Sequence, residues 1–202
     1  DKILSANFPK NLDALILIGD IQAQAFFAMS SAIITGKKKN SDLVKPVEKL
    51  KETLSIYEYK NEEDKKYLLN DRNFLYNIYL ALTVSVNFPS SNSLQDVDHN
   101  ASIKYSILGI NEIDRNKKFE TKDAKLGFYQ TIITAYIAKG NMTKVLDYYY
   151  RYKNLVSVVV NNKQGLSTIT NSAPYLSFQL YNLGLYEESE ELADLLINYT
   201  KP

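Results

Sequence analysis

Cysteine and tryptophan are absent from this 202-residue chain, and it contains a single histidine. Without cysteine the chain has no disulfide framework, no thiol nucleophile and no cysteine-based zinc site. Glycine and proline are also scarce, with seven and five residues respectively, so few positions are natural breaks between elements. These shortages exclude several chemistries and favour long uninterrupted elements.

Excess charge of one sign is also missing, since the formal net charge is +1. A nucleic-acid interface is dominated by clustered Lys and Arg and normally leaves a domain strongly basic. The one basic run, Lys37 to Lys39, is typical of a solvated loop. We therefore expect no nucleic-acid partner.

No uninterrupted apolar run approaches the roughly 20 residues that a membrane span needs. The longest candidate, Ala14 to Ile34, is interrupted by Gly19, Asp20 and two glutamines, and this pattern predicts a buried helix rather than a span. The chain starts at Asp1, as expected of a processed or excised chain. We expect a soluble protein, either cytoplasmic or exported after loss of a signal peptide.

What is present is a globular composition with helical periodicity. Hydrophobic residues make up 45% of the chain and charged residues 23%, which fits one domain over residues 1–202 with a sizeable core. Apolar residues recur at three- and four-residue spacing. One example is the stripe in Ser41 to Lys60 formed by Leu43, Val47, Leu50, Leu54 and Tyr57.

This periodicity predicts an all-α protein of about eight helices, over residues 10–35, 42–58, 63–86, 93–113, 121–138, 142–160, 172–183 and 186–199. Gly36, Pro89, Gly140 and Gly184 mark breaks, and Gly140 and Gly184 favour left-handed turns between helices. The β-branched segment LVSVVVNN (155–162) is expected to be helical despite its strand propensity. The polar segment KQGLSTITNSAP (163–174) is expected to be a loop.

Three segments each carry positions of one repeated helix-pair pattern, which comprise residues of the first helix, a turn, a small position and an aromatic position on the second helix. Near the N-terminus these are Leu15, Ile18 and Gly19, and in TIITAYIAKGNMTKVLDYYYRY they are Tyr136, Gly140, Val145 and Tyr149. In YNLGLYEESEELADLL they are Gly184, Tyr186, Ser189 and Ala193, with Pro202 near the closing proline. This pattern resembles the tetratricopeptide repeat. Second helices near 42, 94, 142 and 186 are spaced more widely than that family's repeat of about 34 residues, so a variant helical-hairpin solenoid is the alternative.

The resemblance implies antiparallel helix pairs stacked as a short right-handed solenoid, whose first helices line a binding groove. The groove-facing residues of the last two pairs would then be Gln130, Thr134, Ile137, Phe178, Tyr181 and Asn182. Amides bond a peptide backbone and rings cover its side chains, so this set suits an extended peptide. The alternative is that Phe178 and Tyr181 pack on the preceding pair.

The stretch DYYYRYK (147–153) concentrates four of the sixteen tyrosines. Helical spacing places Val145, Tyr149, Tyr152 and Val156 on one face, which predicts packing between helices, with the hydroxyls at the edge of the core. An aromatic ligand platform is the competing interpretation.

No motif indicates catalysis. His99 lies beside Asp96 and Asp98, but there is no second histidine, and acidic residues at a helix start are explained by the helix dipole. The acidic run at Glu187 to Glu191 has the same explanation. We expect no enzyme activity, metal or cofactor, and a scaffold module that binds a protein or an extended peptide segment. The alternatives are a helical sensor domain that holds a small molecule or a short signalling peptide and, less favoured, a hydrolase with paired carboxylates.

Overall fold

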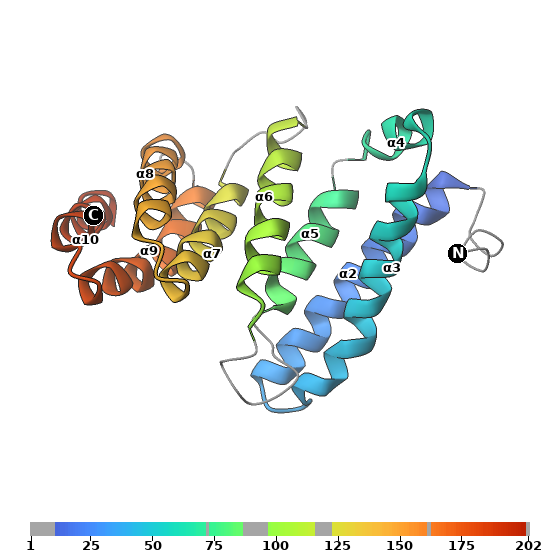
Figure 1. Ribbon diagram of the computed structural model, residues 1–202, viewed down its shortest axis with the longest axis horizontal. Coiled ribbons are helices and arrows are strands. Elements are labelled where there is room, and N and C mark those ends of the chain that lie inside the picture. Colours follow the sequence, from blue (N-terminus) through green and yellow to red (C-terminus); the bar gives the residue numbers. More distant parts are fainter. Residues whose placement is uncertain (1–10, 72, 87–96, 116–122, 161–162, 201–202) are drawn as a thin grey trace. The chain divides into compact units, whose positions relative to one another are not determined.

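The computed structural model describes residues 11–71, 73–86, 97–115, 123–160 and 163–200, and its regular elements over these ranges are all helices (Figure 1). The predicted all-helical class is therefore confirmed for the described residues. The chain divides into two compact units, Asp1–Lys118 and Phe119–Pro202. One continuous domain over residues 1–202 stays a prediction.

Unit 1 contains two helix pairs. The first pair is α2 (Leu12–Ile34) and α3 (Val44–Tyr59), joined by a turn and the short 3-10 helix η1 (Asn40–Leu43). The second pair is α5 (Phe74–Ser85) and α6 (His99–Arg115), and the short α4 (Glu62–Leu68) precedes it. The first helices of the two pairs, α2 and α5, pack against each other.

A glycine permits this close packing. Gly19 of α2 is buried, and a Cβ atom added there would lie 2.9 Å from Cε2 of Phe74 in α5. Real Cβ atoms do not approach a ring carbon so closely, so any larger residue would displace α5 or its ring. The Leu15–Gly19 pattern of the sequence therefore corresponds to a contact between α2 and α5.

The polar residues that interrupt the apolar run of α2 also serve its packing. Asn77 Nδ2 donates to Asp20 Oδ1 at 3.0 Å, and Thr53 Oγ1 donates to Gln22 Oε1 at 2.7 Å. The face of α2 with these residues is packed against α3 and α5, whereas Leu17 and Ile21 are exposed. By length and composition α2 could also cross a membrane, a test that core helices of soluble proteins pass as well. The absence of a membrane span stays a prediction.

Unit 2 has the same organisation. The pair α7 (Ala124–Ala138) and α8 (Met142–Val159) is followed by the pair α9 (Lys163–Asn182) and α10 (Tyr186–Thr200), and α7 packs against α9. Gly140 and Gly184 turn the chain within the pairs with φ of 66° and 78°. The left-handed turns predicted at these glycines are confirmed. The buried core of unit 2 comprises Leu126, Ile133, Val145, Tyr149, Tyr152, Val156, Val159, Val160, Ile169, Ala173, Leu176, Leu180 and Leu192.

Two serines join α9 to α10 by reciprocal hydrogen bonds. Ser189 Oγ donates to the carbonyl oxygen of Ser177 at 2.9 Å, and Ser177 Oγ donates to that of Ser189 at 3.0 Å. The two hydroxyl oxygens lie 3.0 Å apart. Ser189 is the predicted small residue of the last repeat, and it is buried. A small side chain therefore lets the two helices approach here.

The prediction of one helix over residues 63–86 is wrong. The structure contains two helices, α4 and α5, separated by residues 69–73. Asp71 Oδ1 accepts from the backbone N–H of Asn73 at 2.8 Å and of Phe74 at 2.9 Å, and so begins a new helix. Short Asn and Asp side chains compete with the helix for backbone hydrogen bonds, and this run contains three of them.

The predicted loop over residues 163–174 is also wrong, since α9 begins at Lys163 and contains Pro174. Ile169, Ala173, Leu176 and Leu180 are buried at helical spacing, so packing overrides the weak local propensity. Pro174 lies on the exposed side of α9, where water can satisfy the freed carbonyl. The β-branched residues 155–159 are helical as predicted, while Asn161 and Asn162 lie outside the described residues, as do Pro89, Asp96 and Pro202.

Candidate functional site

The tyrosine cluster of α8 is mainly a packing element. Val145, Tyr149, Tyr152 and Val156 are completely buried, which confirms the predicted face. The Tyr149 hydroxyl donates to the carbonyl oxygen of Glu188 in α10 at 2.7 Å. The Tyr152 hydroxyl lies 2.8 Å from Ser172 Oγ of α9. These rings therefore tie α8 to both helices of the last pair.

Burial disfavours ionisation of both hydroxyls. Desolvation raises the pKa of Tyr152 to about 12, against a smaller opposing contribution from the Ser172 hydrogen bond. The pKa of Tyr149 is raised further by burial, with Glu191 adding to the increase. At neutral pH both hydroxyls are neutral and hydrogen-bonded within the protein, and their role is structural.

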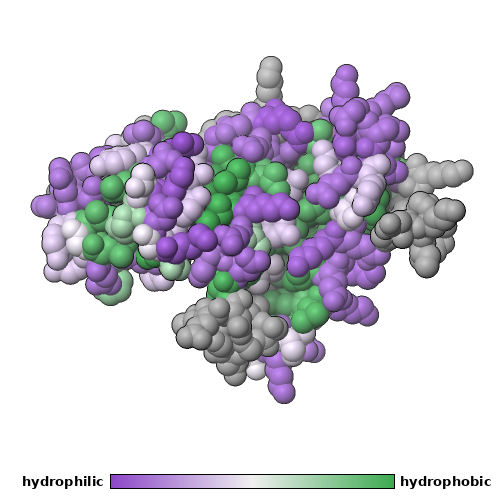
Figure 2. Space-filling view, viewed as in Figure 1, coloured by the Kyte–Doolittle hydropathy of each residue, from purple (hydrophilic) through white to green (hydrophobic). Residues whose placement is uncertain are grey.

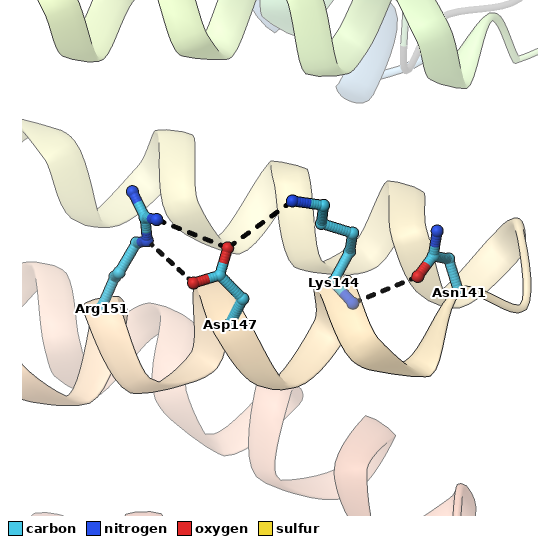
Figure 3. Close-up of polar contacts among 4 residues, drawn as sticks. All are labelled: Asn141, Lys144, Asp147 and Arg151. Atoms are coloured by element: carbon cyan, nitrogen blue, oxygen red, sulfur yellow. Dashed lines mark hydrogen bonds and ion pairs between the residues drawn. The ribbon is translucent and has the colours of Figure 1, made fainter.

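The other side of α8 carries surface charge (Figure 3). Asp147 pairs with Arg151 at 3.2 Å and with Lys144 at 3.9 Å, and Asn141 Oδ1 accepts from the Lys144 backbone N–H at 3.2 Å. The Arg151 guanidinium lies 5.2 Å from the ring centre of Tyr148. These interactions are those of an ordinary solvated helix face and helix start.

The predicted binding residues of α7 contact α9 or the core. Thr134 Oγ1 donates to Gln179 Oε1 at 3.1 Å, and Gln130 Nε2 donates to the carbonyl oxygen of Ser172 at 3.5 Å. Ile137 is half-buried against the core of unit 2. Gln130 and Thr134 therefore position α9, whereas Ile137 belongs to the core packing of unit 2.

The predicted residues of α9 are all exposed. Phe178 is 63% exposed and Tyr181 58% exposed, so neither ring is covered by the preceding pair, and Asn182 is exposed beside them. Two rings that sequence reasoning did not select extend the set. Tyr175 of α9 is 55% exposed, and Tyr186 of α10 meets the Tyr181 ring edge-on at 5.1 Å between centres. We call Tyr175, Phe178, Tyr181 and Tyr186 the aromatic face.

The signal for the two missed rings was present in the sequence. Tyr175 precedes Phe178 by three residues and shares its side of the helix, while Tyr186 follows the Gly184 turn and was assigned to the turn alone. Figure 2 shows hydrophobic residues among hydrophilic ones over the end of unit 2 where α9 meets α10. The aromatic face is formed by two helices, with Tyr175, Phe178 and Tyr181 on α9 and Tyr186 on α10.

Charge is distributed unevenly along the same segment. No charged residue occurs from Leu166 to Tyr186, and four carboxylates follow between Glu187 and Glu191. Glu188 accepts from the Tyr150 hydroxyl at 3.3 Å, and Glu191 pairs with Lys153. Glu187 and Glu190 are exposed and form no ion pair with a described residue. The aromatic face is therefore bordered by free negative charge.

Other chemical groups do not assemble into a site among the described residues. His99 is half-buried at the start of α6, and the described residues contain no group of three or more potential metal ligands. The buried carboxyl groups of the described part are Glu112 and Asp123, and they belong to different units. Burial raises the pKa of Glu112, and its pairing with Arg115 opposes that shift.

Comparison of the chain with protein-family models, with curated proteins and with solved structures finds no match.

Proposed function

We propose that this chain is a non-enzymatic interaction module with stacked tetratricopeptide-like helix pairs, and that it binds a protein or peptide segment on the aromatic face. The observation that carries the proposal is the row of exposed rings on α9, with Tyr175, Phe178 and Tyr181 each more than half exposed. Soluble proteins rarely expose large apolar surfaces, and groups of exposed apolar side chains often mark interaction sites.

The helix-pair arrangement supports the repeat part of the proposal. In each unit the first helices of the two pairs are in contact, α2 with α5 and α7 with α9. This is the packing expected when helix pairs stack in one direction. Gly140 and Gly184 occupy the turn positions of the resemblance and adopt the left-handed conformation that the turn requires.

The side of α9 opposite the rings is firmly packed, as expected of a preformed binding surface. On its other side α9 is held by buried Ile169, Leu176 and Leu180, and by the hydrogen bonds from Gln130 and Thr134. A rigid support limits the entropy lost on binding, so the contacts of the rings contribute more of their free energy to affinity. Asn182 supplies an amide for a peptide backbone at the edge of the face.

Substitution of the exposed rings tests the proposal. The double variant Phe178→Ala/Tyr181→Ala should lose less than about 1.5 kcal/mol of stability per site, because both rings are more than half exposed. It should lose tenfold or more in affinity for a partner captured from native lysate, as expected when anchor rings are truncated.

Tyr59→Ala is the matched control, since Tyr59 is 83% exposed on α3 of unit 1. Affinity can be measured by surface plasmon resonance on the purified partner. Equal affinities of the wild-type chain, the double variant and the control would refute the assignment of binding to the aromatic face.

A further inference from the structure

The segment that carries the aromatic face has charge of only one sign. Between Lys163 and Lys201 the sequence contains no lysine or arginine, and its charged residues there are all acidic. Glu187 directly follows Tyr186 in α10, and Glu190 lies one helical turn after Tyr186. A ligand that lies on the aromatic face therefore contacts uncharged rings and amides along α9, and it reaches carboxylates where the face continues onto α10.

The helix dipole accounts for only part of this acidity. Its stabilisation of carboxylates falls off within the first turn of a helix. Glu187 and Glu188 lie in the first turn of α10, whereas Glu190 lies beyond it. Glu190 also pairs with no described cation, unlike Glu191, which pairs with Lys153. Its carboxylate is thus available for a ligand.

Helical geometry connects this carboxylate to the rings. Tyr186 and Glu190 are four residues apart on α10, so their side chains lie on one face of the helix with Cβ atoms about 5–6 Å apart. The Tyr186 ring contacts the Tyr181 ring at 5.1 Å between centres. A segment that crosses Tyr181 and Tyr186 therefore comes within reach of Glu190.

We infer that the partner is a protein segment in which apolar or aromatic side chains lie within a few residues of a lysine or arginine. The inference rests on the proposed function and adds the chemistry of the ligand. The apolar side chains cover Phe178 and Tyr181, and the cation lies against the Tyr186 ring and near Glu190. The same carboxylates repel acidic segments, nucleic-acid phosphates and anionic lipid surfaces.

A peptide-display selection tests this inference. A library of random 12-residue peptides is selected on the immobilised full-length chain, on Phe178→Ala/Tyr181→Ala and on Glu187→Lys/Glu190→Lys. Enriched peptides are then synthesised, and their dissociation constants are measured by fluorescence anisotropy at low and high salt. The matched control is Glu48→Lys/Glu63→Lys, which changes two exposed carboxylates of unit 1 by the same charge. Circular dichroism establishes that every variant retains its helices.

The expected result is enrichment of peptides that combine apolar residues with Lys or Arg. Their affinity should fall at least fivefold in Glu187→Lys/Glu190→Lys and with increasing salt, and should be unchanged in the control. Peptides that need Phe178 and Tyr181 but show no basic excess, or that tolerate the glutamate changes, overturn this inference and leave the proposed function standing. No enrichment over blank resin, or equal binding by Phe178→Ala/Tyr181→Ala, overturns both.

Discussion

Replacement of Tyr149 by alanine is the most direct test of which side of α8 faces the core. Its ring is completely buried between α8 and α10, and its hydroxyl donates to the Glu188 carbonyl oxygen at 2.7 Å. Truncation of a buried large aromatic residue to alanine costs about 3–5 kcal/mol, because the surrounding helices refill the cavity only partly. We expect Tyr149→Ala to fall in that range.

Two further variants separate the contribution of the Tyr149 ring to stability from that of its hydroxyl, and the buried side of α8 from its exposed side. Tyr149→Phe keeps the ring and loses one hydrogen bond, so the expected loss is about 0.5–1.5 kcal/mol. Tyr150→Ala removes a neighbouring ring that is 46% exposed, and the expected loss is below about 1 kcal/mol.

Urea denaturation followed by circular dichroism measures the three free energies of unfolding. Hydrogen exchange with mass spectrometry then shows whether the weakened helices belong to unit 2. A larger loss for Tyr150→Ala than for Tyr149→Ala would mean that the inside and outside of α8 are reversed, and the assignment of the aromatic face would fail with it.

Three further changes test separate features of the fold. Gly184→Val should destabilise the chain by about 1 kcal/mol or more in urea denaturation, because its φ of 78° penalises a β-branched residue although the space around it is open. Gly19→Ala should lower the stability of unit 1 by about 1–3 kcal/mol, since its Cβ would press on Phe74, and hydrogen exchange should locate the change in α2 and α5. Tyr152 has a pKa of about 12 in the folded chain, whereas a tyrosine of the unfolded chain has a pKa near 10. The free energy of unfolding therefore keeps its full value below pH 10, and it falls by up to about 1.4 kcal/mol per pH unit as the pH rises from 10 towards 12. Tyr152→Phe should reduce this loss when urea midpoints are compared at pH 9 and pH 11.

The sequence was most informative where a residue's chemistry and its spacing agree. The buried face of α8 follows from residues at three- and four-residue intervals, and the turns at Gly140 and Gly184 follow from the need for a left-handed residue. Both features depend on neighbours within a few residues along the chain. Such features can be predicted without knowledge of distant contacts.

The sequence predicted the structure less well where contacts between distant residues determine the conformation or the role of a residue. The segment 163–174 is polar, contains Pro174 and favours a loop locally, yet it is helical because Ile169 and Ala173 pack into the core of unit 2. For the same reason the roles of Gln130 and Thr134 could not be foreseen, since their partners lie about 40 residues away in α9. The exposure of Phe178 and Tyr181 likewise depends on what the rest of the chain leaves uncovered.

The reciprocal hydrogen bonds between Ser177 and Ser189 determine the register of α9 relative to α10 more than they determine how strongly the two helices pack. Apolar contacts between helices are non-directional and tolerate small sliding movements. A hydroxyl that must meet one particular carbonyl, in both directions at once, is satisfied at a single register. Sliding by one residue would break both bonds and move Tyr181 away from Tyr186. The serine pair therefore fixes the register of α9 and α10, and this register keeps Tyr181 and Tyr186 together in one surface.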